Sequence, residues 1–126
     1  MLNNISVVII VKDGGKTINA TLSALSQFSD VVVYDNGSTD DTIEIANKFH
    51  NVNLVQGDFT GFGPTKNKAT TYAKNDWILI LDSDEVADEN FVNHLKSQHL
   101  DNQSVYMVNM VSYYRDIKIK YSGWNN

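Results

Sequence analysis

The chain has 126 residues, 42% of them hydrophobic and 20% charged, which is typical of one folded domain. It contains no cysteine, which excludes disulfides and thiolate metal sites and leaves oxygen or imidazole as metal ligands. The net charge of −5 argues against nucleic acid as a main partner, because phosphate binding requires clustered lysine and arginine. No apolar run approaches the roughly 20 residues that cross a bilayer, and the N-terminus has no export-signal pattern. We therefore expect a cytoplasmic protein.

Apolar runs rich in β-branched residues recur along the chain and lack two-residue alternation. They are Ile5–Val11, Val31–Tyr34, Val52–Val55 and Trp77–Leu81. Such runs predict strands that are buried on both faces.

Helical patterns separate these runs. Apolar residues share one helix face over Ile18–Leu25. Ser38–Asp41 predicts a capping box that opens a second helix, reaching about Phe49. Pro64 suits the first turn of a third helix, reaching about Lys74. Strands that alternate with helices predict an α/β fold with a mostly parallel sheet.

Acidic residues follow three of the predicted strands. Asp13 lies after the first strand, Asp35 after the second, and Asp82 and Asp84 after the fourth. Ligands of such sheets bind beyond the carboxyl ends of the strands. The sequence therefore predicts three acidic loops along one edge.

The pattern changes after Asp88, a predicted N-cap. A helix is expected over Glu89–Leu100, followed by strands at about Val105–Tyr113 and Ile117–Tyr121. No linker or repeat divides the chain, so we expect residues 1–126 to form one domain.

Two of the loops have both a structural and a functional interpretation. Tyr34–Thr42 contains an ordinary turn, but Asp35 can also accept a hydrogen bond from a ligand N–H such as that of uracil. Gly57–Ala69 is glycine-rich without the spacing of a P-loop. We interpret Lys68 as a solvated charge, whereas Lys66, nearer the helix N-terminus, can face an anionic ligand.

The segment Leu81–Val86 fits three templates to different degrees. A calcium EF-hand loop fails because Val86 and Ala87 replace the ligand and glycine that it requires. Asp82 and Asp84 resemble the first motif of haloacid-dehalogenase-like phosphatases, but that motif normally follows the first strand. The third template is the Asp-x-Asp of nucleotide-sugar glycosyltransferases, whose carboxylates hold ribose and a divalent cation.

Four segments occur in the order typical of one family. They are Ile5–Val11, Asp35–Thr42, "GFGPTKNKA" (Gly61–Ala69) and "DWILILDSDE" (Asp76–Glu85). With these segments the chain resembles family 2 glycosyltransferases with the Rossmann-like GT-A fold, over nearly its whole length. The last two segments most resemble small bacterial enzymes that add glucose or a related hexose to the lipopolysaccharide core.

The resemblance implies a uridine site at the first two acidic loops. The backbone around Val11 and the side chain of Asp13 would lie beside the uridine, and Asp35 would pair with the base. The chain departs from the family at "VKDGG" (Val11–Gly15), where related chains often carry Thr-Lys-Asn-Glu.

The resemblance also implies a diphosphate and metal site. Lys66 would lie near the nucleotide, Asp82 would reach the ribose, and Asp84 together with Asp82 would bind Mn²⁺ or Mg²⁺. The implied reaction is inverting transfer of a hexose from a UDP-linked donor to a saccharide or glycolipid acceptor such as lipopolysaccharide core. No residue of this chain is assigned as the catalytic base, and we expect Glu85 and Asp116 to be structural.

Family members continue into an acceptor-binding half, so we expect this chain to be the N-terminal nucleotide-binding part, which binds donor without transferring sugar. Peripheral association with the inner face of the membrane is expected through that other half. Aromatic residues within 105–124 are expected to favour self-association. A metal-dependent phosphatase or nucleotidyltransferase, and a non-catalytic nucleotide-binding module, are the alternative hypotheses.

Overall fold

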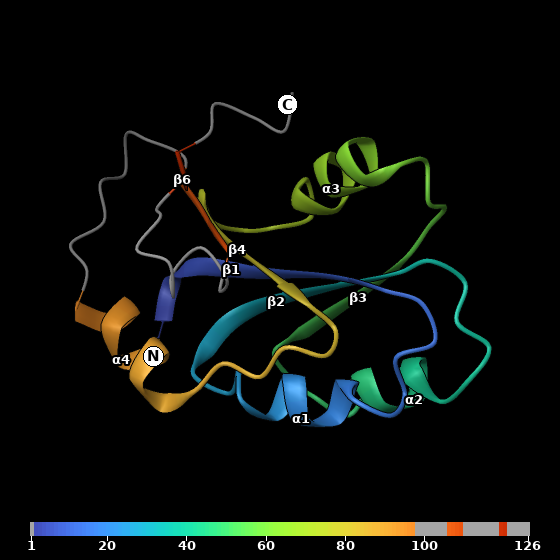
Figure 1. The fold of residues 1–126 in the computed structure, drawn as a ribbon, viewed down its shortest axis with the longest axis horizontal. Helices are drawn as coiled ribbons and strands as arrows, with labels where there is room; N and C mark the ends of the chain where they lie inside the picture. Colours follow the sequence, from blue (N-terminus) through green and yellow to red (C-terminus); the bar gives the residue numbers. More distant parts are fainter. Residues whose placement is uncertain (1, 98–105, 110–118, 121–126) are drawn as a thin grey trace.

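The computed structural model describes residues 2–97, 106–109 and 119–120, which form a sheet in the order β3-β2-β1-β4-β5-β6 (Figure 1). The strands are β1 (Leu2–Val11), β2 (Phe28–Asp35), β3 (Val52–Gln56), β4 (Trp77–Asp82), β5 (Tyr106–Asn109) and β6 (Ile119–Lys120). The helices are α1 (Ile18–Ser23), α2 (Thr42–Ala46), α3 (Phe62–Thr70) and α4 (Glu89–Ser97). All pairings are parallel except that of β5 with β6. The predicted mostly parallel α/β fold is confirmed.

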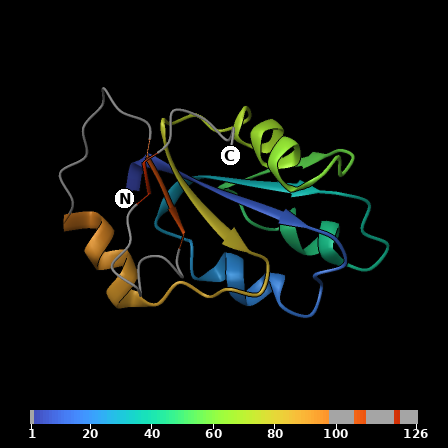
Figure 2. The same cartoon turned by 45° about the horizontal axis from the view of Figure 1, so that its top comes forward.

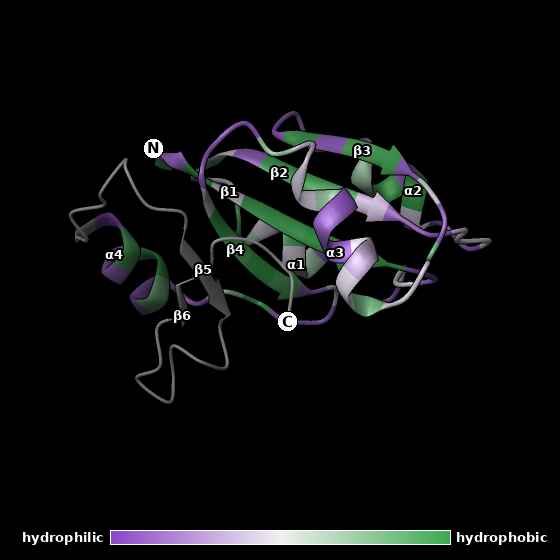
Figure 3. Ribbon diagram, turned by 90° about the horizontal axis from the view of Figure 1, so that it is seen from above, coloured by the Kyte–Doolittle hydropathy of each residue, from purple (hydrophilic) through white to green (hydrophobic). Residues whose placement is uncertain are grey.

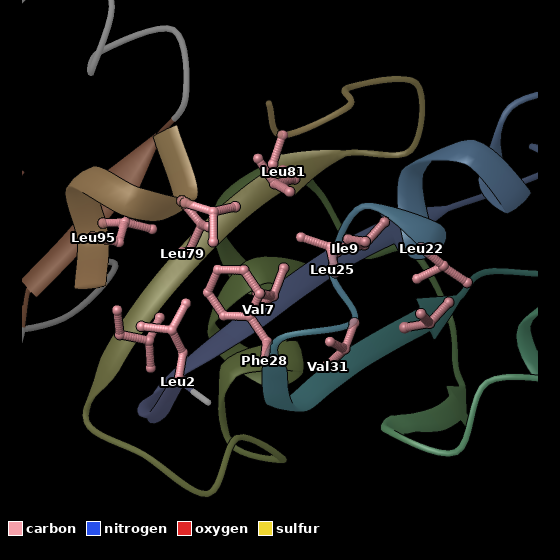
Figure 4. Packing of buried hydrophobic residues seen from close by; sticks show 14 of the residues in the cluster. Leu2, Val7, Ile9, Leu22, Leu25, Phe28, Val31, Leu79, Leu81 and Leu95 are labelled. Carbon is pink, nitrogen blue, oxygen red and sulfur yellow. The ribbon is translucent and has the colours of Figure 1, made fainter. Parts of the chain in front are cut away.

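Helices cover both faces of the sheet, which explains why the strands lack alternation. Figures 1 and 2 show α1 and α2 on one face and α3 on the other. Val7 and Ile9 of β1 pack in the larger core with Leu22 and Leu25, and Figure 4 shows these side chains gathered there. Val8, between them, packs in the smaller core beneath α3. Successive residues of β1 are therefore buried on opposite faces.

Helix α3 is the more hydrophilic cover. Figure 3 shows hydrophobic residues along β1 and β4, with the largely hydrophilic α3 lying over the sheet. Only Thr65 and Ala69 of this helix are buried. Pro64 occupies its first turn as predicted, but the helix ends at Thr70 rather than near Lys74.

Strand β3 is less buried than its apolar sequence predicts. Val52, Leu54 and Val55 are only half-buried, because β3 is the edge strand and pairs with β2 alone. Val52 and Leu54 pack against the larger core and Val55 against the smaller one, so the expected burial on both faces is only partial for this strand.

The predicted capping box at Ser38–Asp41 is also wrong. Helix α2 begins at Thr42 and ends at Ala46, before Phe49, and its N-cap residue Asp41 makes no side-chain capping bond. The hydroxyl of Ser38 instead donates to the carboxylate of Asp35. This short-range bond competes with the cap because it is available within the preceding turn.

The predicted N-cap at Asp88 is confirmed, since its Oδ1 accepts from the N–H of Phe91 at 2.7 Å. Strands β5 and β6 lie within the two late strands that the sequence predicts. Several other predicted features lie outside the described residues. They are the remainder of those strands, the end of the predicted helix Glu89–Leu100, Asp116 and the aromatic residues near Trp124. Among the residues described, no helix is long and apolar enough to cross a membrane.

Candidate functional site

The three acidic loops begin at one edge of the sheet, as the sequence predicts. In the parallel register, Val11 lies opposite Asp35 of β2, and Ile10 lies opposite Asp82 of β4. The carboxyl ends of β2, β1 and β4 are therefore level. The loops that follow them, with Asp13 and Asp84, leave the sheet side by side.

The loop after β1 is bound to the loop after β2. Asp13 Oδ1 accepts from the backbone N–H of Thr39 at 2.7 Å and of Asp40 at 3.3 Å. The N–H of Asp13 donates to Ser38 Oγ at 2.7 Å, and that of Gly15 donates to Asp40 Oδ2 at 2.9 Å. We call these residues, 13–15 and 38–40, the loop clasp. The clasp makes the two loops one unit.

Asp40 is a fully exposed carboxylate with several donors. The hydroxyl of Thr42 donates to its Oδ1, and the N–H of Thr42 does so at 3.0 Å. The Thr42 hydroxyl, then the Thr42 N–H, and more weakly the Gly15 N–H, hold the pKa of Asp40 below its ordinary value. The ionised form is therefore the one that the clasp binds.

Asp35 is buried within its own turn and has no exposed surface. Its Oδ2 accepts from the N–H groups of Gly37 at 3.2 Å and Ser38 at 3.0 Å, and its Oδ1 accepts from the Ser38 hydroxyl. These bonds use about three of the roughly four acceptor sites of a carboxylate. The structure shows Asp35 as the residue that forms this turn, and base recognition by Asp35 stays a prediction.

Asp82 and Asp84 lie on the loop after β4 with exposed side chains. Glu85 closes this loop, because its Oε1 accepts from the Asp82 N–H at 2.7 Å and its own N–H donates to the Asp82 carbonyl at 3.1 Å. Burial raises the pKa of Glu85, and the charges of Asp82 and Asp84 add to this, against the hydrogen bond from the Asp82 N–H. The expected structural role of Glu85 agrees with these contacts.

The residue between the two aspartates is held by helix α1. The carbonyl oxygen of Ser83 lies 3.0 Å from Thr17 Oγ1 and 2.7 Å from Thr21 Oγ1. Sequence reasoning missed this contact, because more than 60 residues separate its partners and neither threonine belongs to a motif.

The loop after β4 fits a divalent cation that is held only partly by protein. No group of three histidine, aspartate or glutamate residues with the geometry of a metal site occurs in the described part of the chain. Asp82 and Asp84 nevertheless offer two exposed carboxylates one residue apart, and oxygen ligands suit Mg²⁺ and Mn²⁺. Such ions are commonly bound by one or two carboxylates and substrate phosphates.

Lys66 lies in α3, where the sequence predicts it, with an aromatic neighbour. Its ammonium group is 4.5 Å from the ring centroid of Phe62, which is 63% exposed. Phe59 packs edge-on against Phe62 at 6.1 Å. The ammonium group of this mid-helix lysine is thus oriented toward Phe62, the first residue of α3.

The sequence profile of glycosyl transferase family 2 matches residues 6–126. The chain belongs to this family. An uncharacterised glycosyltransferase of Rickettsia prowazekii is 29% identical to it over 119 residues, 90% of this chain and 40% of that protein. The chain therefore spans less than half the length of this relative.

Solved structures show the same fold. The crystal structure of S. aureus TarS 1-349 superposes with a TM-score of 0.66 at 26% identity, covering 75% of this chain and 31% of TarS. Glucosyl-3-phosphoglycerate synthase from Mycobacterium tuberculosis, solved in complex with Mn²⁺, UDP and glucosyl-3-phosphoglycerate, has a TM-score of 0.56 at 24% identity, covering 64% of this chain and 33% of that one. The Rossmann-like GT-A fold that the sequence predicts is confirmed.

Proposed function

We propose that this family 2 chain is the nucleotide-sugar-binding part of a glycosyltransferase that uses a UDP-linked hexose and Mn²⁺ or Mg²⁺. The observation that carries the proposal is the pair of exposed carboxylates, Asp82 and Asp84, on a closed loop at the carboxyl edge of a parallel sheet. That edge is where ligands of such sheets bind. The M. tuberculosis enzyme with the same fold was solved with UDP and Mn²⁺, which agrees with the proposal.

Asp84, together with Asp82, would hold the cation, and Asp82 would also reach the ribose. A bound cation would stabilise the negative charge of the departing diphosphate. The chain itself supplies two exposed carboxylates one residue apart, and like charges repel by roughly 1 kcal/mol at about 4 Å in water, which favours a bound dication. Lys66 of α3 would approach the nucleotide as a second positive charge near the phosphates.

The uridine would lie over the loop clasp, beside the backbone of Val11 and the side chain of Asp13. Because the clasp hydrogen bonds already join the two loops, little ordering would be required on binding. Asp35 would pair with the base through its remaining acceptor site, which requires the Asp35–Ser38 turn to open enough to expose it.

The proposed reaction is inverting. A base would take the proton of an acceptor hydroxyl, whose oxygen bonds to the anomeric carbon from the side opposite the diphosphate as the bond from that carbon to the diphosphate oxygen breaks. Asp82 and Asp84 would lie on the diphosphate side, so they are not candidates for this base. We propose a saccharide or glycolipid acceptor such as lipopolysaccharide core, at the inner face of the cytoplasmic membrane, and residues 1–126 as one donor-binding domain.

The alternative hypothesis of a metal-dependent phosphatase loses its support. The Asp82–Asp84 motif follows β4, whereas the phosphatase motif normally follows the first strand. The family match covers the motif as part of a glycosyl transferase sequence.

Calorimetric titration of UDP, with Mn²⁺ or with EDTA, tests the proposal. We expect UDP to bind with Mn²⁺ and much more weakly in EDTA, and Asp84→Asn to abolish this difference without changing the fold. Asp76→Asn is the matched control, since Asp76 is an exposed aspartate next to the other end of β4. Equal affinity of the unmodified chain in Mn²⁺ and in EDTA would overturn the proposed cation site, and the absence of UDP binding in both would overturn the proposal as a whole.

A further inference from the structure

The two threonines that contact Ser83 are spaced four residues apart at the start of α1. Thr17 is the N-cap residue of this helix and Thr21 lies inside it, so their side chains lie on one helix face, one turn apart. Thr21 is fully buried. Both hydroxyls converge on a single carbonyl oxygen, which has two lone pairs and can accept both.

Each hydroxyl has one proton, and the distances show where it goes. Thr21 Oγ1 is 2.7 Å from the Ser83 carbonyl but 3.2 Å from the carbonyl of Thr17. Thr17 Oγ1 is 3.0 Å from the Ser83 carbonyl but 3.4 Å from that of Gly14. For both threonines the bond to the Ser83 carbonyl is the shorter one. The alternative acceptors are the carbonyl of Thr17, the N-cap residue of α1, and that of Gly14, which precedes the helix.

Helix formation does not account for either threonine. An N-cap threonine ordinarily accepts a hydrogen bond from the first turn, but the side chain of Thr17 makes no capping bond. Threonine inside a helix is a weak helix former, and no motif calls for one at position 21. Their shared contact with Ser83 gives both side chains a role that capping and propensity do not.

Gly14 packs close to Ser83 from the loop after β1. A Cβ atom built there would lie 2.6 Å from Val11 Cγ2 and 3.3 Å from Ser83 Oγ. The first distance is a clash and the second a tight contact, so Gly14 lies directly against the side chain of Ser83. Ser83 is fixed by its carbonyl and by its packing, while its neighbours Asp82 and Asp84 stay exposed.

We infer that Thr17 and Thr21 are positioning residues for the cation site, because they anchor Ser83 and so fix the two flanking carboxylates relative to the sheet. Asp82 and Asp84 repel each other when no cation is bound, and an unanchored loop would let them separate. Anchoring the residue between them keeps both carboxylates ready for one ion. This inference rests on the proposed cation and UDP site.

The test compares Thr21→Val, which keeps the side-chain shape but loses the hydroxyl, with Thr21→Ser, which keeps the hydroxyl. The Mn²⁺ concentration at half-maximal UDP binding is measured for both, and for Thr17→Val combined with Thr21→Val. We expect Thr21→Val to raise this concentration by about 10-fold, as for other partners that orient metal ligands, and the double variant to raise it further. Thr21→Ser should stay close to the unmodified chain, and UDP binding in EDTA should not change.

Ile5→Val is the control for a general loss of stability, because Ile5 is buried in β1 far from its carboxyl end. An equal change of Mn²⁺ requirement in Ile5→Val and Thr21→Val would overturn the inference, as would no change in Thr21→Val. Amide hydrogen exchange of residues 82–85 without metal separates the two proposals. If the unmodified chain does not bind UDP but these amides exchange faster in Thr21→Val, the anchoring of Ser83 is supported and the proposed function is overturned. If the unmodified chain binds UDP and Thr21→Val changes neither the exchange nor the Mn²⁺ requirement, the anchoring alone is overturned.

Discussion

The carboxylate of Asp13 accepts a hydrogen bond from the backbone N–H of Thr39 at 2.7 Å, so a side chain of the loop after β1 binds the backbone of the loop after β2. Asp13 does this with a positive φ of 55°, a conformation that aspartate and asparagine tolerate better than most residues. One residue therefore supplies both the turn of its own loop and the link to the next.

Two replacements of Asp13 should test these two contributions together. Asp13→Ala loses the acceptor and places a residue poorly suited to positive φ, so we expect the free energy of unfolding to fall by about 1–2 kcal/mol. Asp13→Asn keeps an acceptor oxygen and the tolerated conformation, and should cost less than half as much. Urea denaturation measures both, with Lys12→Ala as the control at an exposed neighbour. Equal losses in the two Asp13 variants would show that neither the acceptor for Thr39 nor the tolerance of positive φ contributes to stability.

The hydrogen bonds that Asp40 accepts, chiefly from Thr42 and more weakly from Gly15, should contribute less to stability in acid. The pKa of Asp40 is lowered from its ordinary value of 3.8, chiefly by the hydroxyl of Thr42. The folded state therefore binds fewer protons than the unfolded state, and this contribution to stability is complete above pH 3.8 and is lost as the pH falls through the lower folded-state pKa.

We expect Asp40→Asn to be less stable than the unmodified chain at neutral pH and to approach it below pH 3.8, because only the unmodified chain loses this contribution there. Urea denaturation across pH 3 to 7 measures the difference between the two chains. Asp76→Asn removes an exposed carboxylate elsewhere and serves as the control. A difference between Asp40→Asn and the unmodified chain that stays constant with pH would contradict the assignment.

The strands could be predicted because burial on both faces requires a continuous run of apolar residues, which is visible in the local sequence. Ile5–Val11 and Trp77–Leu81 read as continuous apolar runs and lie at the centre of the sheet. Val52–Val55 reads the same way, yet its place at the edge depends on the order of the strands, which no local pattern contains. The only partial burial of β3 could therefore not be predicted from its local sequence.

The site was predictable to the level of its loops and no further. The position of Asp82 and Asp84 after a buried strand follows from the sequence together with the rule for parallel sheets. The hydrogen-bond partners of the side chains do not follow from the sequence. Ser38, for example, could form a helix cap or bond to Asp35, and only the folded turn decides between the two. The contact of Thr21 with Ser83 joins residues 62 positions apart, so it exists only once α1 packs against the loop after β4.

Replacing Asp35 should show whether the residue that forms this turn also recognises the uracil base of UDP. We expect Asp35→Ala to weaken binding of UDP while leaving the affinity for pyrophosphate nearly unchanged, because Asp35 belongs to a different loop from Asp82 and Asp84. It should also lower stability by about 1–3 kcal/mol, since the N–H groups of Gly37 and Ser38 lose their acceptor. Titration of both ligands checks the first effect, and urea denaturation the second. Equal loss of affinity for both ligands would leave Asp35 as a turn former alone.

Gly57, just after β3, should tolerate no side chain. A Cβ atom there would lie 2.2 Å from the hydroxyl oxygen of Tyr34 and 2.7 Å from its Cζ, and Tyr34 is fully buried. The tyrosine cannot easily move, because its hydroxyl donates to the carbonyl of Asp58 at 2.9 Å. We expect Gly57→Ala to lower the free energy of unfolding by about 1–3 kcal/mol through overpacking.

Tyr34→Phe provides the matched test, because it removes the oxygen nearest to the added methyl group. Alone it should cost about 1 kcal/mol by losing the bond to Asp58. Combined with Gly57→Ala, it should cost less than the sum of the two single variants, since the closest clash disappears while the contact with Cζ remains. Urea denaturation of the two single variants and the double variant measures this coupling. Strict additivity would mean that the hydroxyl of Tyr34 is not what excludes a side chain from position 57, and the clash would then have to lie with the ring itself.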